Sequence, residues 1–336
     1  MRNKEMDQKE KFLSVRDLEV IYTSRKKIVQ AVNKISFDME KGETLALVGE
    51  TGAGKTTIAK AILGILPDPP AKVLGGSVYL EGEELLGMPE EQMLDIRGKK
   101  IAMIFQDPMT ALNPLMTVGE QIMEGLMLHN DYDKKQAEEK AKEMLEMVGI
   151  PAQRSVEYPF EFSGGMKQRV VIAMALACNP LLLLADEPTT ALDVTIQAQV
   201  LDLIKDLRRK YHTSMLLITH DLGVVAETSD NVAVVYAGKI IEYGTKKDIF
   251  LHPMHPYTKG LFASLPGMNA GEKRLKPIAG NPPDPTDLPK GCAFAERCPE
   301  ATDACRAGEI PVTAVSESHS CCCIHLGQEV EKDVID

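Results

Sequence analysis

Two stretches of this chain carry residues whose types and spacing suit chemistry on phosphates. The first, residues 49–56, reads Gly-Glu-Thr-Gly-Ala-Gly-Lys-Thr and fits the pattern G-x-x-x-x-G-K-[ST]. Glycines let consecutive backbone N–H groups curl around phosphate oxygens at the start of a helix. Lys55 would then reach the β- and γ-phosphates, and the Thr56 hydroxyl would bind Mg²⁺. A simple glycine-rich turn would explain the glycines, but the apolar run before the loop and the helical spacing after it favour a phosphate loop.

The second stretch is an apolar run that ends in two acids. Residues 181–184 are all leucine, and Ala185, Asp186 and Glu187 follow them. Ligands of open α/β sheets bind at the carboxyl ends of the strands, which is where these acids would lie. Asp186 would then contribute to the Mg²⁺ shell, and Glu187 would polarise an attacking water as general base. The pair alone also suits a helix cap or a solvated loop, so its meaning depends on the phosphate loop.

The third chemical feature is a concentration of cysteine near the C-terminus. Of seven cysteines, Cys178 stands alone in an apolar stretch and six follow residue 291. In a reducing compartment such a cluster favours a metal site over disulfides. Four thiolates bind either Zn²⁺ or a [4Fe–4S] cluster. The first three cysteines of the cluster are separated by five and six residues, which is wider than most structural zinc pairs and favours iron–sulfur, with zinc as the alternative.

Hydrophobic spacing predicts the elements that position these residues. Residues 13–48 alternate apolar and polar stretches, which predicts several strands, the last of which runs into the glycine-rich loop. Residues 56–66 have helical spacing and stop at a proline cluster. Residues 133–150 predict a strongly amphipathic helix. From Gly165 to about residue 255, helices alternate with apolar runs, which predicts a parallel α/β sheet covered on both faces, and loops dominate afterwards.

Composition and charge exclude several classes of protein. The chain has 336 residues, 44% of them hydrophobic and 26% charged, as in ordinary globular proteins. Its 38 Lys and Arg against 49 Asp and Glu leave a formal net charge of −11, which weighs against nucleic acid as a partner. No uninterrupted apolar stretch approaches the roughly 18 residues of a membrane-spanning helix. The charged first fifteen residues have no apolar core of a secretion signal, so we expect a cytoplasmic protein.

A third motif connects these features to a known family. Residues 162–169 read Phe-Ser-Gly-Gly-Met-Lys-Gln-Arg and resemble the signature loop of ABC-transporter ATPases, placed ahead of the carboxylate strand as in that family. A Ser-Gly-Gly entry to a helix also binds anions at the helix N-terminus, although an N-cap with a glycine turn would explain the serine by itself. The resemblance implies an α/β P-loop NTPase of the ABC type. Residues 1–254 would form the nucleotide-binding domain, which includes an antiparallel β subdomain and a helical signature subdomain at about 107–165. Residues 255–336 would form a small loop-rich, cysteine-containing extension.

The resemblance also implies roles for individual residues. Gln106 matches the Q-loop glutamine, which contacts Mg²⁺ or water and couples the site to membrane subunits, and His220 matches the switch histidine that contacts the γ-phosphate. With Glu187 these would be the catalytic residues, and Thr56 and Gln106 the Mg²⁺ contacts. Tyr22 lies where the family places an aromatic that stacks on adenine. The implied ATP contacts are Tyr22, Gly49, Glu50, Thr51, Gly52, Ala53, Gly54, Lys55, Thr56, Thr57, Ser163, Gly164, Gly165, Asp186 and the D-loop residue Asp193.

Two further segments narrow the resemblance. Residues 107–122 and 252–266 look like the dipeptide/oligopeptide branch of bacterial ABC importers, and so does the cysteine-rich tail. That tail implies a cluster on Cys292, Cys298, Cys305 and Cys323, with Cys321 and Cys322 as bystanders.

The branch implies a function and a set of partners. The chain would hydrolyse ATP to power import of di- or oligopeptides, peripherally at the cytoplasmic face of the cell membrane. Its partners would be two transmembrane permeases, an extracytoplasmic peptide-binding protein and a second ABC ATPase subunit, either a relative or another copy. The alternatives are an importer ATPase for nickel or oligosaccharides, or a soluble ABC ATPase of DNA repair or translation.

Overall fold

The computed structural model describes residues 11–24, 27–190, 192–264 and 277–327. By their internal contacts the residues divide into two compact units. The first comprises residues 1–39, 45–86 and 220–336, and the second comprises residues 40–44 and 87–219. In the described part of the chain, every helix is too short or too polar to cross a membrane.

An antiparallel sheet opens the first unit. Its strands follow the order β2-β1-β4-β5, with β1 at Leu13–Ser24, β2 at Lys27–Met39, β4 at Ala71–Leu80 and β5 at Glu83–Glu84. On β1, Leu13, Val15, Leu18 and Val20 are fully buried. The spacing of these residues breaks from two to three where the register with both neighbours shifts, so a bulge keeps the apolar side chains on one face.

The second sheet segment of this unit surrounds the phosphate loop. Strand β3 (Thr44–Val48) pairs in parallel with β9 (Asn231–Tyr236), and β10 (Lys239–Thr245) pairs with β9 in antiparallel fashion. Positive φ angles at Ala237 and Gly238 form the tight turn between them. The parallel expectation is therefore confirmed for β3 and β9 and wrong for β10, because a two-residue turn can only join antiparallel strands. Three helices complete this segment: α2 (Lys55–Ile62), α9 (Leu222–Thr228) and α10 (Lys246–Leu251).

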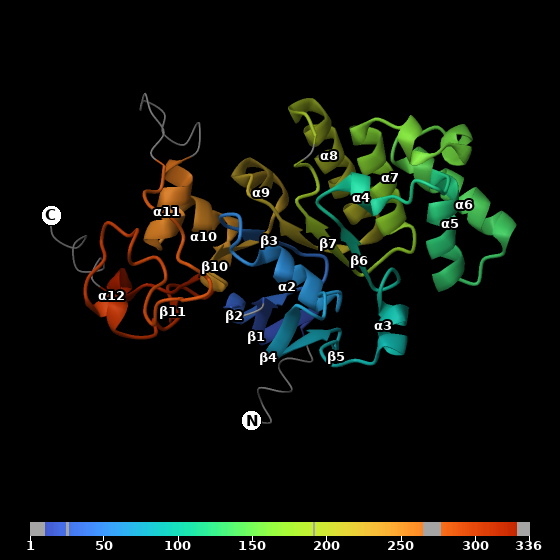
Figure 1. The fold of residues 1–336 in the computed structure, drawn as a ribbon. Helices are drawn as coiled ribbons and strands as arrows, with labels where there is room; N and C mark the ends of the chain where they lie inside the picture. The colour runs from blue at the N-terminus through green and yellow to red at the C-terminus, as the bar shows by residue number, and fades with distance from the viewer. Residues whose placement is uncertain (1–10, 25–26, 191, 265–276, 328–336) are drawn as a thin grey trace. The chain divides into compact units, whose positions relative to one another are not determined.

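The C-terminal extension packs onto the same core. It contains α11 (Pro256–Ala263), α12 (Ala304–Ala307), β11 (Thr313–Ala314), β12 (Ser320–Cys321) and a final 3₁₀ turn at Ile324–Gly327. Figure 1 shows these orange and red elements gathered beside β10, to which β12 is hydrogen-bonded. Tyr257 and Phe294 of the extension join Val48, Val234 and Tyr236 in one buried cluster. The predicted loops therefore hold few regular elements but contribute large side chains to the core.

The second unit combines parallel strands with a group of helices. Strands β6 (Ile101–Ile104), β7 (Leu182–Asp186) and β8 (Ser214–Ile218) are parallel, with β7 in the middle. Every residue of the three strands is buried, as expected of strands covered on both faces. The helices are α3 (Glu90–Ile96), α4 (Pro108–Ala111), α5 (Val118–His129), α6 (Lys134–Met147), α7 (Gly164–Leu176) and α8 (Val194–Tyr211), with 3₁₀ turns at Ala152–Val156 and Pro159–Glu161.

The amphipathic helix predicted over 133–150 is α6. Its buried residues Ala137, Ala141, Met144 and Leu145 recur at intervals that place them on one face. Asp133 caps its first turn and Gln136 reaches back to the Asp133 backbone, so the helix starts one residue after the predicted position. Figure 1 shows α5, α6 and α7 grouped together in green.

Candidate functional site

The phosphate loop lies between β3 and α2 in the first unit. At Gly49, φ is 149° and an added Cβ would lie 2.1 Å from the Val235 carbonyl oxygen. At Gly54, φ is 100° and a Cβ would lie 2.2 Å from the Ala31 carbonyl oxygen. Both positions therefore require glycine for space as well as for conformation. Backbone carbonyl groups of β9 and β2 lie against the two ends of the loop, so no larger residue fits at Gly49 or Gly54.

Lys55 folds back over this loop. Its side chain is buried, and Nζ donates hydrogen bonds to the carbonyl oxygens of Gly49 at 2.7 Å and of Glu50 at 3.0 Å. Within the described residues, no side chain caps α2, and its first turn carries no acid. The partial positive charge of this helix end and the Lys55 ammonium are therefore both suited to bind phosphate.

Tyr22 connects β1 to the start of α2. Its hydroxyl lies 3.3 Å from Oγ1 of Thr57, and the tyrosine is half-buried. The two residues, predicted separately as ATP contacts, are therefore neighbours in the fold. A half-buried ring beside the first turn of α2 offers a face for a base, and stacking on adenine stays a prediction.

The part of the predicted site that belongs to the second unit lies at the C-terminal end of β7. Asp186 is buried, and Glu187 follows with φ at 46°, a left-handed conformation rare for non-glycine residues. The Glu187 N–H donates to the Ile218 carbonyl oxygen at 2.8 Å, which holds this conformation. Its Oε2 accepts hydrogen bonds from Gln106 Nε2 at 2.8 Å and from Thr190 Oγ1 at 2.9 Å. The structure thus brings together two residues predicted to be catalytic and orients the carboxylate from two sides.

The signature loop begins α7. Ser163 caps the helix, its Oγ accepting from the Met166 N–H at 3.4 Å. A Cβ on Gly165 would lie 2.7 Å from Cγ2 of Ile196 in α8, whereas a Cβ on Gly164 would meet open space. The second glycine therefore serves helix packing, and the first leaves the helix start accessible.

Sequence reasoning missed Gln168. Its buried Nε2 donates to the Pro188 carbonyl oxygen at 2.6 Å and so ties α7 to the residue after Glu187. The available signal was a polar residue inside an apolar helix three positions beyond the second glycine.

Two further predicted residues lie at the starts of helices. Asp193 caps α8, with Oδ1 accepting from the Ile196 N–H at 3.0 Å. His220 is exposed and directly precedes Asp221, which caps α9. The compact units separate the predicted residues: the phosphate loop, Tyr22 and His220 belong to the first, and Gln106, Ser163, Asp186, Glu187 and Asp193 to the second.

The four cysteines predicted as ligands line one small cavity of about 20 Å³ in the extension. Cys322 lines it too, together with His255 and His325. Cys321 lines a larger cavity of about 630 Å³, which Cys322 lines as well. The cavity residues predicted from sequence are Cys292, Cys298, Cys305 and Cys323.

Burial determines the protonation of most of these thiols. It raises the pKa of Cys292, Cys298 and Cys323, and that of Cys322 to about 11. Burial acts in the same direction on Cys305, but hydrogen bonds from Thr302 and His325 bring its pKa below the usual value. Without a bound cation the cavity therefore favours mostly neutral thiols, as a low-dielectric site does.

The donors of the cavity are thiols, which bind either Zn²⁺ or an iron–sulfur cluster. Among the described residues, no three His, Cys, Asp or Glu side chains are grouped closely enough to hold a single metal ion. A tetrahedral zinc site needs all four sulfurs about 2.3 Å from one centre. A cluster that bears a thiolate at each of its irons accommodates sulfurs that lie further apart.

The strand–phosphate loop–helix unit, the Asp-Glu end of a parallel strand and the Ser-Gly-Gly helix start define a P-loop ATPase of the ABC type. The ABC transporter family model matches residues 32–190, and the model for the oligopeptide/dipeptide transporter C-terminal region matches residues 241–305. The chain belongs to the ATP-binding subunits of dipeptide and oligopeptide ABC transporters.

Individual relatives agree with this assignment. The dipeptide transport ATP-binding protein DppD of Bacillus subtilis is 51% identical over 97% of this chain and 98% of its own length. The oligopeptide transport ATP-binding protein OppD of the same organism is 52% identical over 92% of this chain and 87% of its own. A dimeric structure of the ATP-binding cassette MJ0796 with ADP and phosphate superposes with a TM-score of 0.63 at 26% identity, covering 70% of this chain and 98% of that one.

These matches settle the function at the level of the transporter. The chain is an ABC ATPase that couples ATP hydrolysis to import of di- and oligopeptides. The nickel, oligosaccharide and DNA repair or translation alternatives are not supported. Neither family description nor relative's name mentions a metal cluster, so the iron–sulfur site stays a prediction.

Proposed function

We propose that Glu187 is the general base of ATP hydrolysis and that Gln106 orients it. The observation that carries this proposal is the pair of hydrogen bonds that Gln106 and Thr190 donate to the same oxygen of Glu187. With Oε2 held, the other carboxylate oxygen can accept a proton from a water. The left-handed backbone of Glu187 supports the assignment, because such strain collects at functional residues.

The remaining ATP contacts follow from the phosphate loop. Lys55 and the first turn of α2 bind the β- and γ-phosphates, and Thr56, Asp186 and Gln106 contribute to the Mg²⁺ shell. Bound Mg²⁺ would neutralise charge that develops on the phosphates. Tyr22 stacks on adenine, His220 contacts the γ-phosphate, and the residues around them supply backbone amides and packing. The buried position of Asp186 at a strand end supports its place near a cation.

The chain acts as one half of an ATPase dimer. The capped but accessible start of α7 at Ser163 offers a positive helix end to the ATP of the opposite subunit, with Asp193 at the adjoining D-loop. That a related cassette is described as dimeric supports this arrangement.

The complete importer supplies the remaining partners. They are a relative or a second copy of this chain, two transmembrane permeases and an extracytoplasmic peptide-binding protein, and the ATPase lies peripherally at the cytoplasmic face of the membrane. Residues 1–254 would form the nucleotide-binding domain, with a helical subdomain at about 107–165, and residues 255–336 the importer extension.

The cysteine cavity holds a [4Fe–4S] cluster with a structural role. Five thiols on a single cavity match the donor type of such a cluster, and Zn²⁺, which thiolates also bind, is the alternative. Protein purified without oxygen should contain iron and sulfide and absorb broadly in the visible range. Cys323→Ala should lose most of the iron and Cys321→Ala should keep it. Colourless protein that contains stoichiometric zinc would contradict the proposal of an iron–sulfur cluster.

Glu187→Gln in the reconstituted importer tests the catalytic proposal. Loss of the base should lower peptide-dependent ATP turnover by at least about a hundredfold, with ATP affinity preserved. Glu138→Gln is a matched control, because that acid pairs with Lys142 at an exposed position on α6. Near-normal turnover in Glu187→Gln would show that another group is the base.

A further inference from the structure

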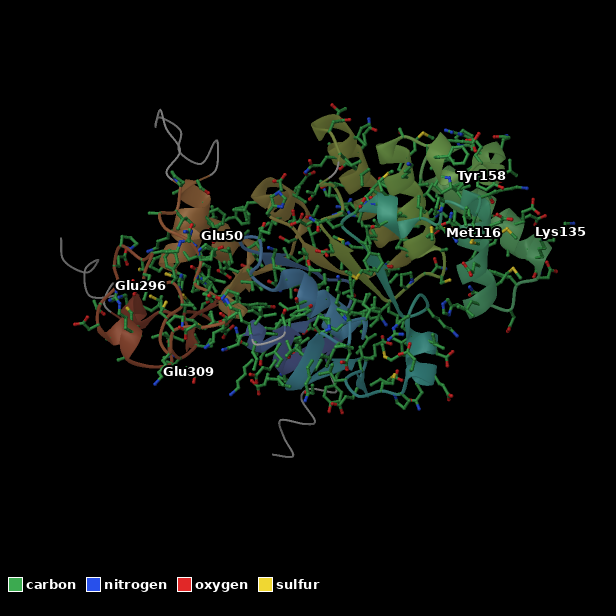
Figure 2. All side chains as sticks on the ribbon, viewed as in Figure 1. Glu50, Met116, Lys135, Tyr158, Glu296 and Glu309 are labelled. Carbon is green, nitrogen blue, oxygen red and sulfur yellow. The ribbon has the colours of Figure 1, made fainter. Side chains whose placement is uncertain are left out.

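An arginine of the C-terminal extension reaches into the phosphate loop. Arg297 Nη1 donates to Glu50 Oε2 at 2.8 Å, and Nη2 donates to Glu50 Oε1 at 2.9 Å. This bidentate ion pair joins residues 247 positions apart. Figure 2 labels Glu50, whose backbone contacts Tyr257 of α11 at the start of the extension. Two parallel charge-assisted hydrogen bonds are among the strongest that a surface-accessible carboxylate can form.

The surroundings of Arg297 hold its guanidinium in this position. Only 5% of its side chain is exposed. Its Nη1 also donates to the Tyr236 hydroxyl at 3.2 Å, its Nε donates to the Ala279 carbonyl oxygen at 3.0 Å, and the guanidinium lies 5.8 Å from the ring centre of Phe294. The hydrogen bonds to Glu50 are the largest cause of its raised pKa. The arginine is therefore preorganised to meet the loop.

Glu50 is the residue at which the extension and the phosphate loop meet. Its N–H donates to the hydroxyl of Tyr257 at 2.9 Å, and its carbonyl oxygen accepts from Lys55 Nζ at 3.0 Å. Tyr257 is fully buried and its ring lies 4.5 Å from that of Tyr236, so it cannot move without disturbing the core. Both residues that hold Glu50 from outside the loop, Tyr257 and Arg297, belong to the extension.

We propose that Arg297 is a positioning residue for ATP binding, acting through Glu50. It neutralises a carboxylate inside a loop that must receive the phosphates of ATP, and it fixes the residue on which Lys55 rests. Without the arginine, the Glu50 charge would repel the phosphates and the loop would lose its anchor. The extension thereby becomes part of the nucleotide site, whether or not its cysteine cavity holds a cluster.

Equilibrium titration of the full chain with a fluorescent ATP analogue tests this role. Arg297→Ala should weaken binding by about tenfold, the size expected for hydrogen bonds to a charged group. Glu50→Gln added to Arg297→Ala should recover most of the affinity, because the unpaired charge is then gone. The Glu50→Gln single variant completes the double-mutant cycle. Arg297→Lys keeps the charge without the planar fork and should fall between wild type and Arg297→Ala.

The control and the rescue separate positioning from simple loss of structure. Arg306→Ala is matched, because Arg306 also adjoins a cavity cysteine and pairs with Glu296, but at an exposed position. It should bind the analogue like wild type. If Arg297→Ala merely unfolded the extension, the double variant would bind as weakly as the single one. That result, or wild-type affinity in Arg297→Ala, would overturn the proposal.

Discussion

Gln106 and Glu187 are 81 residues apart in sequence, and the Gln106 amide donates to the Glu187 carboxylate at 2.8 Å. Gln106 follows β6 and Glu187 follows β7, and these strands are parallel neighbours, so their carboxyl ends meet at one edge of the sheet. The glutamine named as a link to the membrane subunits is thus bonded directly to the proposed base. Any movement that displaces Gln106 removes one of the two hydrogen bonds that hold Glu187 Oε2, while Thr190 keeps the other.

Gln106→Ala should lower the maximal rate of ATP hydrolysis by about tenfold, because the carboxylate loses one of two donors that orient it. The KM for ATP should change less, since Lys55 and the phosphate loop are untouched. Thr190→Val removes the other donor and should also lower the maximal rate of ATP hydrolysis, by less than Gln106→Ala does. Steady-state hydrolysis by the reconstituted importer measures both. Unchanged rates in both variants would show that these hydrogen bonds do not matter for catalysis.

Gly165→Ala should destabilise the protein by about 1–3 kcal/mol, because its Cβ would press on Ile196 and overpacking has costs of this size. Gly164→Ala, one position earlier, meets open space and should leave the thermal unfolding midpoint nearly unchanged. Ile196→Ala combined with Gly165→Ala should restore part of the lost stability. Equal midpoints for the two single variants would refute the packing explanation.

Glu242→Leu should destabilise the protein by about 3–5 kcal/mol, the usual result of breaking a buried pair. Glu242 is buried and accepts hydrogen bonds from the N–H groups of Met254 and His255, and its Oε1 lies 2.8 Å from Nε2 of His319. All these groups would lose their partner. Denaturant unfolding measures the effect, with Glu309→Leu as the control at an exposed position labelled in Figure 2, where a change within about 0.5 kcal/mol is expected.

Acid sensitivity should depend on Asp248. Hydrogen bonds from Thr245, and a further one from Ser318, hold the pKa of this carboxyl below its usual value. A folded-state pKa below the unfolded one stabilises the protein above the unfolded pKa, and this contribution is lost as pH falls through the folded pKa. Asp248→Asn should therefore be less stable near neutral pH and show a flatter loss of stability below about pH 4. A parallel pair of unfolding curves against pH would contradict this.

Much of the fold could be predicted from local pattern. Helix α8 begins and ends where its apolar spacing does, and the continuous apolar runs are the buried strands β7 and β8. Helix α2 ends at Ile62, four residues before the predicted end, because Gly64 adopts a positive φ angle. Hydrophobic periodicity indicates which face of a helix or strand is buried, but the residue at which the element ends depends on single positions such as Gly64.

The ATP-site residues were recognisable because their chemistry is local. Glycines, a lysine and a threonine must be consecutive to curl around phosphates, so they appear as a motif. Glu187 was recognisable because two acids follow an apolar run, whereas Gln106 was assigned through the resemblance to the ABC family. The sequence by itself therefore determined the class of enzyme and the residues most directly concerned with ATP.

Only the tertiary structure decided which distant residues support that site. Nothing in the spacing of Glu50 and Arg297 predicts an ion pair, and only the fold shows that Cys322, expected to be a bystander like Cys321, lines the shared cavity with Cys323. In β12 and the residues after it, consecutive side chains point in different directions once the strand pairs with β10. Contacts of this kind arise when separate segments pack on one core, so they belong to the fold as a whole and leave no signature in neighbouring residues.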